Sequence, residues 1–120
     1  MIRLSELKIP LAALQQHPED HSEIHPLAQL HALAAQALGV PASAIAQLYV
    51  FKRSFDARRA GVQAVYIVDV QLADPGQEVA LLAQHAQHPH IQPTPDMAWQ
   101  PPVQAPATLA DRPVVVGFGP

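Results

Sequence analysis

Alternating apolar and polar residues predict three β-strands in the first two thirds of the chain. Residues 3–11 alternate around Leu7 and Ile9, which predicts a strand with Pro10 near its end. Residues 47–56 are rich in strand-forming side chains. Residues 62–72 show the clearest alternation, with every second residue apolar and on one face. The second and third strands follow each other closely and predict a hairpin.

Two helices are predicted between and after these strands. Residues 26–38 place apolar side chains at helical spacing, and Gly39 is a natural stop. Asp74 is a natural cap for a helix that ends near residue 87, ahead of Pro89. The expected core stripe of this second helix consists of Val79, Leu82, Ala83 and Ala86.

The order of elements over residues 1–95 is β-α-β-β-α-β, if residues 90–95 form a last edge strand and residues 15–24 a loop. This order predicts an α+β fold of the ferredoxin-like kind, with an antiparallel sheet and two helices on one face. Residues 96–111 are rich in proline and predict an extended linker.

Composition narrows the function classes. The chain of 120 residues has a net charge of −3 and no cysteine, which excludes disulfides and gives no general attraction to nucleic acid. The N-terminus lacks the apolar stretch of a signal peptide, and no run is long enough to span a membrane. We therefore expect a soluble, cytoplasmic protein.

Residues 112–120 change character again. Val114, Val115 and Val116 predict a buried parallel strand that runs directly into Gly117 and Gly119. In dinucleotide-binding units such a strand precedes a Gly-x-Gly turn, whose backbone approaches the pyrophosphate. The third glycine, the helix and the acidic ribose contact of that motif do not follow within the 120 residues. From the pattern alone, an ordinary terminal strand with glycines is equally compatible.

Five segments resemble a largely uncharacterised group of bacterial FAD-dependent dehydrogenases. They are Met1–Leu11, Lys52–Arg58, Tyr66–Val70, Pro101–Pro106 and Arg112–Pro120. The resemblance extends over the whole chain. It implies that residues 112–120 begin the FAD-binding domain of a longer oxidoreductase, cut within its nucleotide motif.

The resemblance also implies a function. FAD would be the cofactor of the parent protein, with Gly117 and Gly119 at its pyrophosphate and none bound to these 120 residues alone. Residues 1–95 would then be an accessory domain that packs on the flavin domain of the same polypeptide. Such a domain shapes substrate access, docks or recruits a partner, while the flavin performs the chemistry.

The hairpin between residues 52 and 59 concentrates four of the seven basic residues of the chain. Alternation separates its residues into two faces, and Asp56 is expected to pair with Arg58 or Lys52. Guanidinium groups there predict a site for a carboxylate, a phosphate or RNA. A solvated tip that keeps a sheet edge soluble is the other interpretation. The candidate residues are Lys52, Arg53, Ser54, Asp56, Arg58 and Arg59.

Other candidate sites are weaker. His17, His21 and His25 are four residues apart, but Pro18 and Pro26 disfavour a helix that would align them, so we expect no metal site. No catalytic motif is recognised, and Asp69 is expected to face the half-exposed side or pair with Arg53. A sheet face with Phe51, Val65 and Ile67 leaves homodimerisation open as an alternative function.

Overall fold

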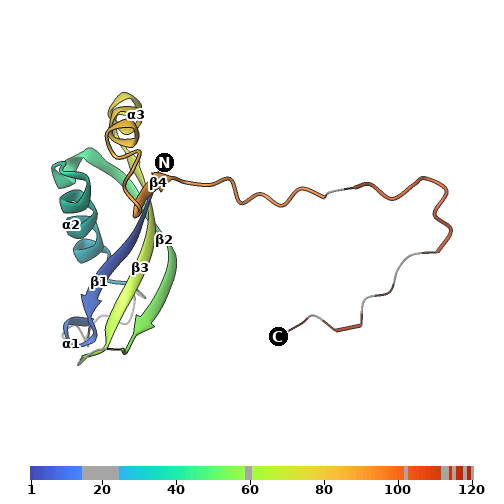
Figure 1. The fold of residues 1–120 in the computed structure, drawn as a ribbon, viewed down its shortest axis with the longest axis horizontal. Helices are drawn as coiled ribbons and strands as arrows, with labels where there is room; N and C mark the ends of the chain where they lie inside the picture. Colours follow the sequence, from blue (N-terminus) through green and yellow to red (C-terminus); the bar gives the residue numbers. More distant parts are fainter. Residues whose placement is uncertain are drawn as a thin grey trace.

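The computed structural model describes residues 1–14, 25–58, 61–101, 103–111, 114, 116, 117 and 119. Figure 1 shows a layer of strands with helices beside it and a long tail. The elements are strand β1 (Ile2–Pro10), helix α1 (Leu11–Leu14), helix α2 (Leu27–Leu38), the 3-10 helix η1 (Ala42–Ala44), strand β2 (Ile45–Asp56), strand β3 (Gln63–Leu72), helix α3 (Pro75–Gln84) and strand β4 (Ile91–Pro93).

The strands form one antiparallel sheet in the order β2-β3-β1-β4. The chain is therefore an α+β protein with a four-stranded antiparallel sheet, and each predicted strand is confirmed within a few residues. Two predictions need adjustment. The short helix α1 was not expected, and the segment predicted as a loop, residues 15–24, lies outside the described residues.

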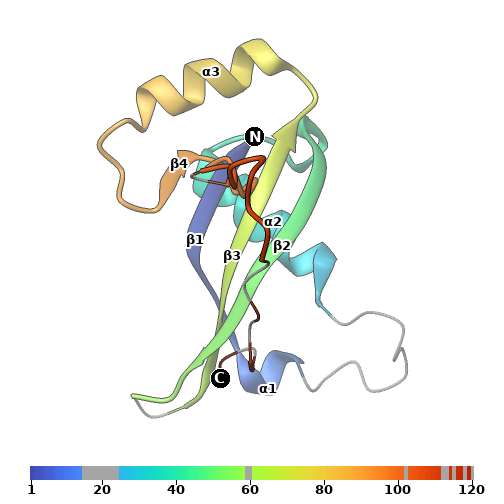
Figure 2. The same ribbon diagram turned by 90° about the vertical axis from the view of Figure 1, so that its right-hand side faces the viewer.

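The core lies between the sheet and α2. The alternation predicted for β3 is confirmed, because Ala64, Tyr66, Val68 and Val70 are each 0% exposed. Figure 2 shows α2 behind the sheet, where its buried residues meet the apolar positions of β1 and β3. Gly39 ends α2 with φ 67°, a left-handed conformation that glycine adopts without strain. The buried residues of α2 are Leu30, Ala34, Ala35 and Leu38.

Helix α3 lies across the end of the sheet, and its predicted stripe is confirmed only at Leu82, which packs against the core, whereas Val79, Ala83 and Ala86 are exposed. Val79 is 69% exposed, whereas Leu81 is buried and joins the core. Polar contacts of Glu78 set the orientation of the helix. Its carboxylate turns inward, pairs with the N-terminal amino group and accepts a hydrogen bond from the backbone N–H of Leu72 at 3.3 Å. Asp74 caps the helix as predicted, since its Oδ1 accepts from the N–H of Gly76 at 2.8 Å.

Two β-bulges flank Ile67 on the central strand β3. On β1 the register shifts between Leu4 and Leu7, and on β2 it shifts between Val50 and Lys52. Glu6 has φ 62° at the first of these positions. Bulges increase the local twist of a sheet and re-aim side chains. The second bulge inserts Phe51, which lies on the sheet face opposite α2.

The tail after β4 leaves on the side of the sheet opposite α2 (Figures 1 and 2). Its described residues lie in no helix or strand. Of the strand predicted for Val114–Val116, Val114 and Val116 are 86% and 94% exposed and lie in no helix or strand, and Val115 lies outside the described residues. Within the described residues, no helix combines the length and apolar character needed to cross a membrane.

Candidate functional site

The sheet face opposite α2 has a row of polar side chains at one end. The strand register places Gln92, Arg3, Asp69 and Tyr49 side by side, one on each strand. Arg3 donates to Asp69 from Nε to Oδ1 and from Nη2 to Oδ2, each at 2.8 Å. Thr94, the first residue after β4, donates from Oγ1 to Oδ1 of Asp69 at 3.1 Å. These hydrogen bonds thereby join β1 and β3 to the start of the tail.

Phe51 covers this ion pair. The Cζ atom of Arg3 lies 3.7 Å from the centroid of the Phe51 ring, a cation–π contact. The side chains of Arg3 and Asp69 are only 15% and 11% exposed. The hydrogen bonds from Arg3 hold the pKa of Asp69 below its ordinary range and raise the pKa of Arg3. The expected pairing of Asp69 with Arg53 is wrong, because Arg53 lies opposite Tyr66.

The surroundings of the cluster are apolar. Tyr49 is 51% and Phe51 is 48% exposed, and the partly buried Val65 and Ile67 lie on the same face of β3, opposite Ser54 and Lys52. Tyr49 is oriented by a short hydrogen bond from its hydroxyl group to Oε1 of Gln47. We call the surface made by Arg3, Tyr49, Phe51, Val65, Ile67 and Asp69 the open face.

The basic hairpin does not bring its charges to one point. Lys52, Ser54 and Asp56 lie opposite Ile67, Val65 and Gln63, on the side of the open face. Arg53 lies opposite the buried Tyr66 and therefore on the side of α2. The separation into two faces agrees with the alternation of the sequence. Arg59 lies outside the described residues.

Asp56 and Arg58 form the one predicted pair that the structure brings together. Arg58 donates to the carboxylate from Nε at 2.9 Å, from Nη2 at 2.7 Å and from its backbone N–H at 3.1 Å. These bonds hold the pKa of Asp56 well below its usual range. The guanidinium group is thereby fixed at the turn, with its side chain still 86% exposed.

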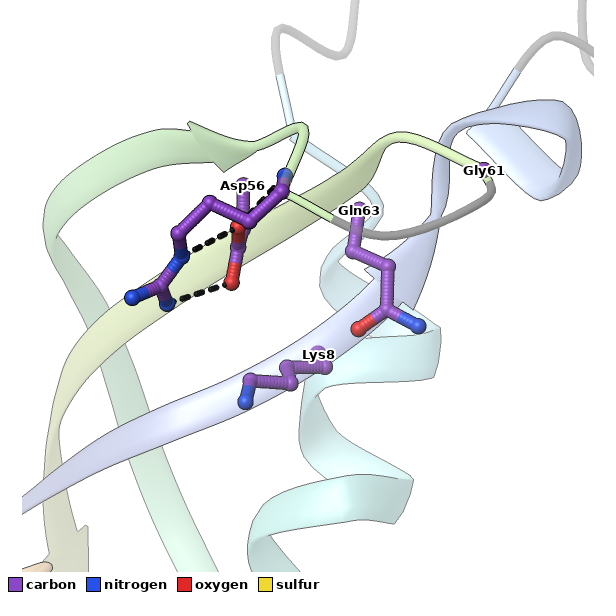
Figure 3. Close-up of a pocket in the computed structure, with 5 residues that line it drawn as sticks. Lys8, Asp56, Gly61 and Gln63 are labelled. Carbon is purple, nitrogen blue, oxygen red and sulfur yellow. Dashed lines mark hydrogen bonds and ion pairs between the residues drawn. The ribbon is translucent and has the colours of Figure 1, made fainter.

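A hollow of about 330 Å³ lies beside this pair (Figure 3). Lys8 and Gln63 point toward it from β1 and β3. Lys8 is paired with Glu6 at 2.9 Å, and this pairing lowers the pKa of Glu6. Both cations at the hollow thus have a carboxylate partner, so the hollow is polar and close to electrically neutral. Its lining residues are Lys8, Asp56, Arg58, Gly61 and Gln63.

His25 and Tyr66 form a buried polar pair that the sequence did not indicate. Their rings meet edge to face with centroids 5.8 Å apart. The Nδ1 atom of His25 and the hydroxyl group of Tyr66 are both buried, and neither has a hydrogen-bond partner among the described residues. Burial, and secondarily the charge of Arg53, lowers the pKa of His25.

Two further sets of candidate residues are the histidines near the N-terminus and the glycines at the end of the tail. No group of three or more His, Cys, Asp or Glu side chains among them could hold a metal ion, and His17 and His21 lie outside the described residues. Gly117 and Gly119 have φ of 91° and 84°, a conformation that favours glycine. No described atom lies within 4 Å of a Cβ built at either glycine.

One protein family matches the chain. It is described as a domain of unknown function (DUF8436), and the match covers residues 1–71, more than half of the 120 residues. The chain belongs to the DUF8436 family. The DUF8436 match includes Arg3, Phe51 and Asp69 of the open face and the whole hairpin up to Arg59, and it ends within β3. A search of curated proteins found no match to the chain.

Proposed function

We propose that this DUF8436 domain is the N-terminal accessory domain of a FAD-dependent oxidoreductase, and that it docks on the flavin domain rather than reacting with substrate. The observation that carries the proposal is the tail. It leaves the sheet on the side of the open face and leads to the Val-rich Gly-x-Gly segment that resembles the start of a flavin-binding domain (Figure 1).

The sheet order supports a ferredoxin-like topology for this domain. In that topology the two β-α-β halves interlock, so that the first and third strands are central and the second and fourth are at the edges. The order β2-β3-β1-β4 agrees with this arrangement. Many ferredoxin-like domains have unrelated functions, so the topology is compatible with a docking role without requiring it.

The open face supports docking. Two aromatic side chains that are about half exposed stand next to a shielded ion pair, on a face that no helix of the described residues covers. Aromatic residues are enriched at protein interfaces because they bury a large area at low entropic cost. The tail would join the flavin domain to this surface, the flavin domain would pack over the tail, and FAD would belong to that domain.

The test extends the chain with the residues that its source gene encodes after Pro120. We expect the extended protein to purify with the visible absorbance of an oxidised flavin, and the 120-residue chain to bind no FAD at micromolar concentration. A second variant of the extended protein lacks residues 1–95. It should retain flavin and lose catalytic efficiency with an artificial electron acceptor.

Two results would overturn the proposal. If the extended protein purifies without flavin, the proposed oxidoreductase function is excluded. The accessory role of residues 1–95 is excluded if the variant without them matches the extended protein in flavin content, kcat and KM.

The hollow beside Arg58 favours a second function, the binding of RNA or a small anionic ligand. Lys8 and Arg58 would offer their remaining N–H donors to a phosphate or carboxylate. Binding of RNA should weaken with salt and be lost in Arg58→Ala. Because both cations already have carboxylate partners, Asp56→Asn should strengthen such binding. If neither the unmodified chain nor Asp56→Asn binds RNA or a small anion at low salt, this function is excluded.

A further inference from the structure

The tail has exposed apolar side chains within reach of the open face. Met97 is 67%, Trp99 is 80% and Val103 is 79% exposed. Trp99 is the only tryptophan of the chain. Large apolar side chains gathered on one segment usually mark a surface that packs against another. The tail therefore has apolar side chains to bury, and the open face has exposed aromatic residues.

The structure fixes where the tail starts. Thr94 donates its backbone N–H to the carbonyl oxygen of Met1 at 3.0 Å and its hydroxyl group to Asp69 at 3.1 Å. The tail is thus tied to the edge of the open face, at the end of the row that leads from Gln92 to Tyr49. From this anchor it continues on the side of the sheet opposite α2 (Figure 2).

The reach of the tail matches the width of the sheet. Three strand spacings separate β4 from β2, which is about 14 Å at the usual spacing between paired strands. Trp99 follows Thr94 by five residues, which span about 16 Å in an extended chain with a rise of ~3.1 Å per residue. A tail that crosses the row therefore brings Trp99 to β2, where Tyr49 and Phe51 lie.

We propose that the open face is the docking surface for this chain's own tail, with Trp99 seated on Tyr49 and Phe51. The inference goes beyond the flavoprotein proposal and does not depend on it, because it uses only residues 1–103. The structure holds the tail in the undocked arrangement. Docking covers the two aromatic rings and the remaining exposed part of the Arg3–Asp69 pair.

The tail of the same chain has an advantage over a second copy as the occupant. Its covalent attachment gives it a high effective concentration at the open face, in the millimolar range for short connections. Pro93, Pro95 and Pro101 restrict the backbone, and residues that precede proline favour extended conformations. Less conformational entropy is therefore lost when the tail is ordered on the sheet.

The test uses the fluorescence of Trp99 in the 120-residue chain, at several protein concentrations. We expect a blue-shifted emission maximum and weak quenching by acrylamide, both independent of concentration. Phe51→Ala should lower the ratio of docked to undocked tail about tenfold and shift the emission toward that of exposed tryptophan. Phe55→Ala is the matched control, because Phe55 is 56% exposed on the other side of the same strand.

The other outcomes decide against the proposal. Emission typical of exposed tryptophan in the unmodified chain, or equal effects of Phe51→Ala and Phe55→Ala, would overturn it. A blue shift that grows with concentration would assign the open face to the tail of a second copy instead. If Phe51→Ala does not fold by circular dichroism, Tyr49→Ser provides the same comparison, and unchanged emission in that folded variant would also refute docking.

Discussion

Arg3 and Asp69 hold opposite charges at a position that water hardly reaches. Their side chains are 15% and 11% exposed. Nε and Nη2 of Arg3 each donate a hydrogen bond to one oxygen of the Asp69 carboxylate. Shielded ion pairs of this kind gain little over an apolar pair, but they make the removal of one partner costly. The pair therefore fixes the register of β1 against β3 and the position of the tail.

Asp69→Asn should lower the free energy of unfolding by about 2–4 kcal/mol, because it leaves the Arg3 guanidinium group shielded without a counter-charge. Urea denaturation at neutral pH measures the change. Asp96→Asn is the control, since Asp96 lies in the exposed tail and should change stability by less than about 0.5 kcal/mol. Equal stability of the two variants would mean that the pair is not shielded in solution.

His25 should make folding dependent on pH. Burial lowers its pKa from the ordinary value of 6.5, so the folded protein disfavours the protonated form. The unfolded chain then binds more protons, and stability is complete above pH 6.5 and falls as the pH decreases toward the folded pKa. His25→Phe keeps an aromatic ring beside Tyr66 and should flatten this dependence in thermal unfolding between neutral and mildly acidic pH. An unchanged slope would assign the dependence to other histidines.

Tyr66→Phe should leave stability unchanged or raise it by up to about 1 kcal/mol. The hydroxyl group is buried and has no partner within the described part of the chain, and such a group loses its hydration when the protein folds. Tyr49→Phe, at a half-exposed position, provides the reference in the same denaturation experiment. A clear loss of stability in Tyr66→Phe would reveal that the hydroxyl group of Tyr66 makes a hydrogen bond in the folded protein.

The residue scale also shows where sequence patterns fail. The pairing of Asp56 with Arg58 was one of two predicted alternatives, because the residues are two positions apart. The partner of Asp69 was missed, because Arg3 is 66 positions away and only the sheet order brings them together. A local pattern contains no information about which distant strand lies alongside.

At the scale of the element, local signals were sufficient for two helix ends and for the buried face of β3, but not for the buried face of α3. Gly39 and Asp74 end and begin their helices as predicted, because capping depends on neighbouring residues alone. The stripe of α3 was right at Leu82 but wrong at Val79, because Glu78 turns inward to the N-terminus, a contact between distant parts of the chain. The bulges beside Ile67 were not predicted, because both depend on the paired strands.

Gly39→Ala should lower the free energy of unfolding by about 1 kcal/mol, because alanine is disfavoured at φ 67°. No atom lies within 4 Å of an added Cβ, so the cost arises from the backbone alone. Gln36→Ala, on the exposed side of α2, controls for the loss of a surface side chain. Gly39→Asn should lower the stability less than Gly39→Ala does, because asparagine tolerates the left-handed region. The reverse order of the two variants in thermal unfolding would contradict the capping argument.

At the scale of the whole molecule, stability is distributed unevenly along the sheet. The central strands β1 and β3 are paired on both sides and contribute most of the core, whereas residues 51–55 of β2 are all exposed. The sheet therefore has a well-packed end beside α2 and a loosely covered end at the basic hairpin. The alternation of β3 predicted the well-packed end from the sequence. The loosely covered end became visible only with the sheet order, which places β2 at the edge.

Hydrogen exchange should resolve these two ends. The amides of Val68 and Val70, on 0% exposed residues of the central strand, should exchange only through global unfolding. Amides of β2 beyond the bulge at Phe51 should exchange at least about tenfold faster, which corresponds to an opening free energy lower by about 1.4 kcal/mol. If the tail docks on the open face, Phe51→Ala should speed exchange around Tyr49 more than Phe55→Ala does. Uniform protection along β2 would instead show that the hairpin unfolds together with the core, and the bulge beside Ile67 would then not separate two regions of the sheet.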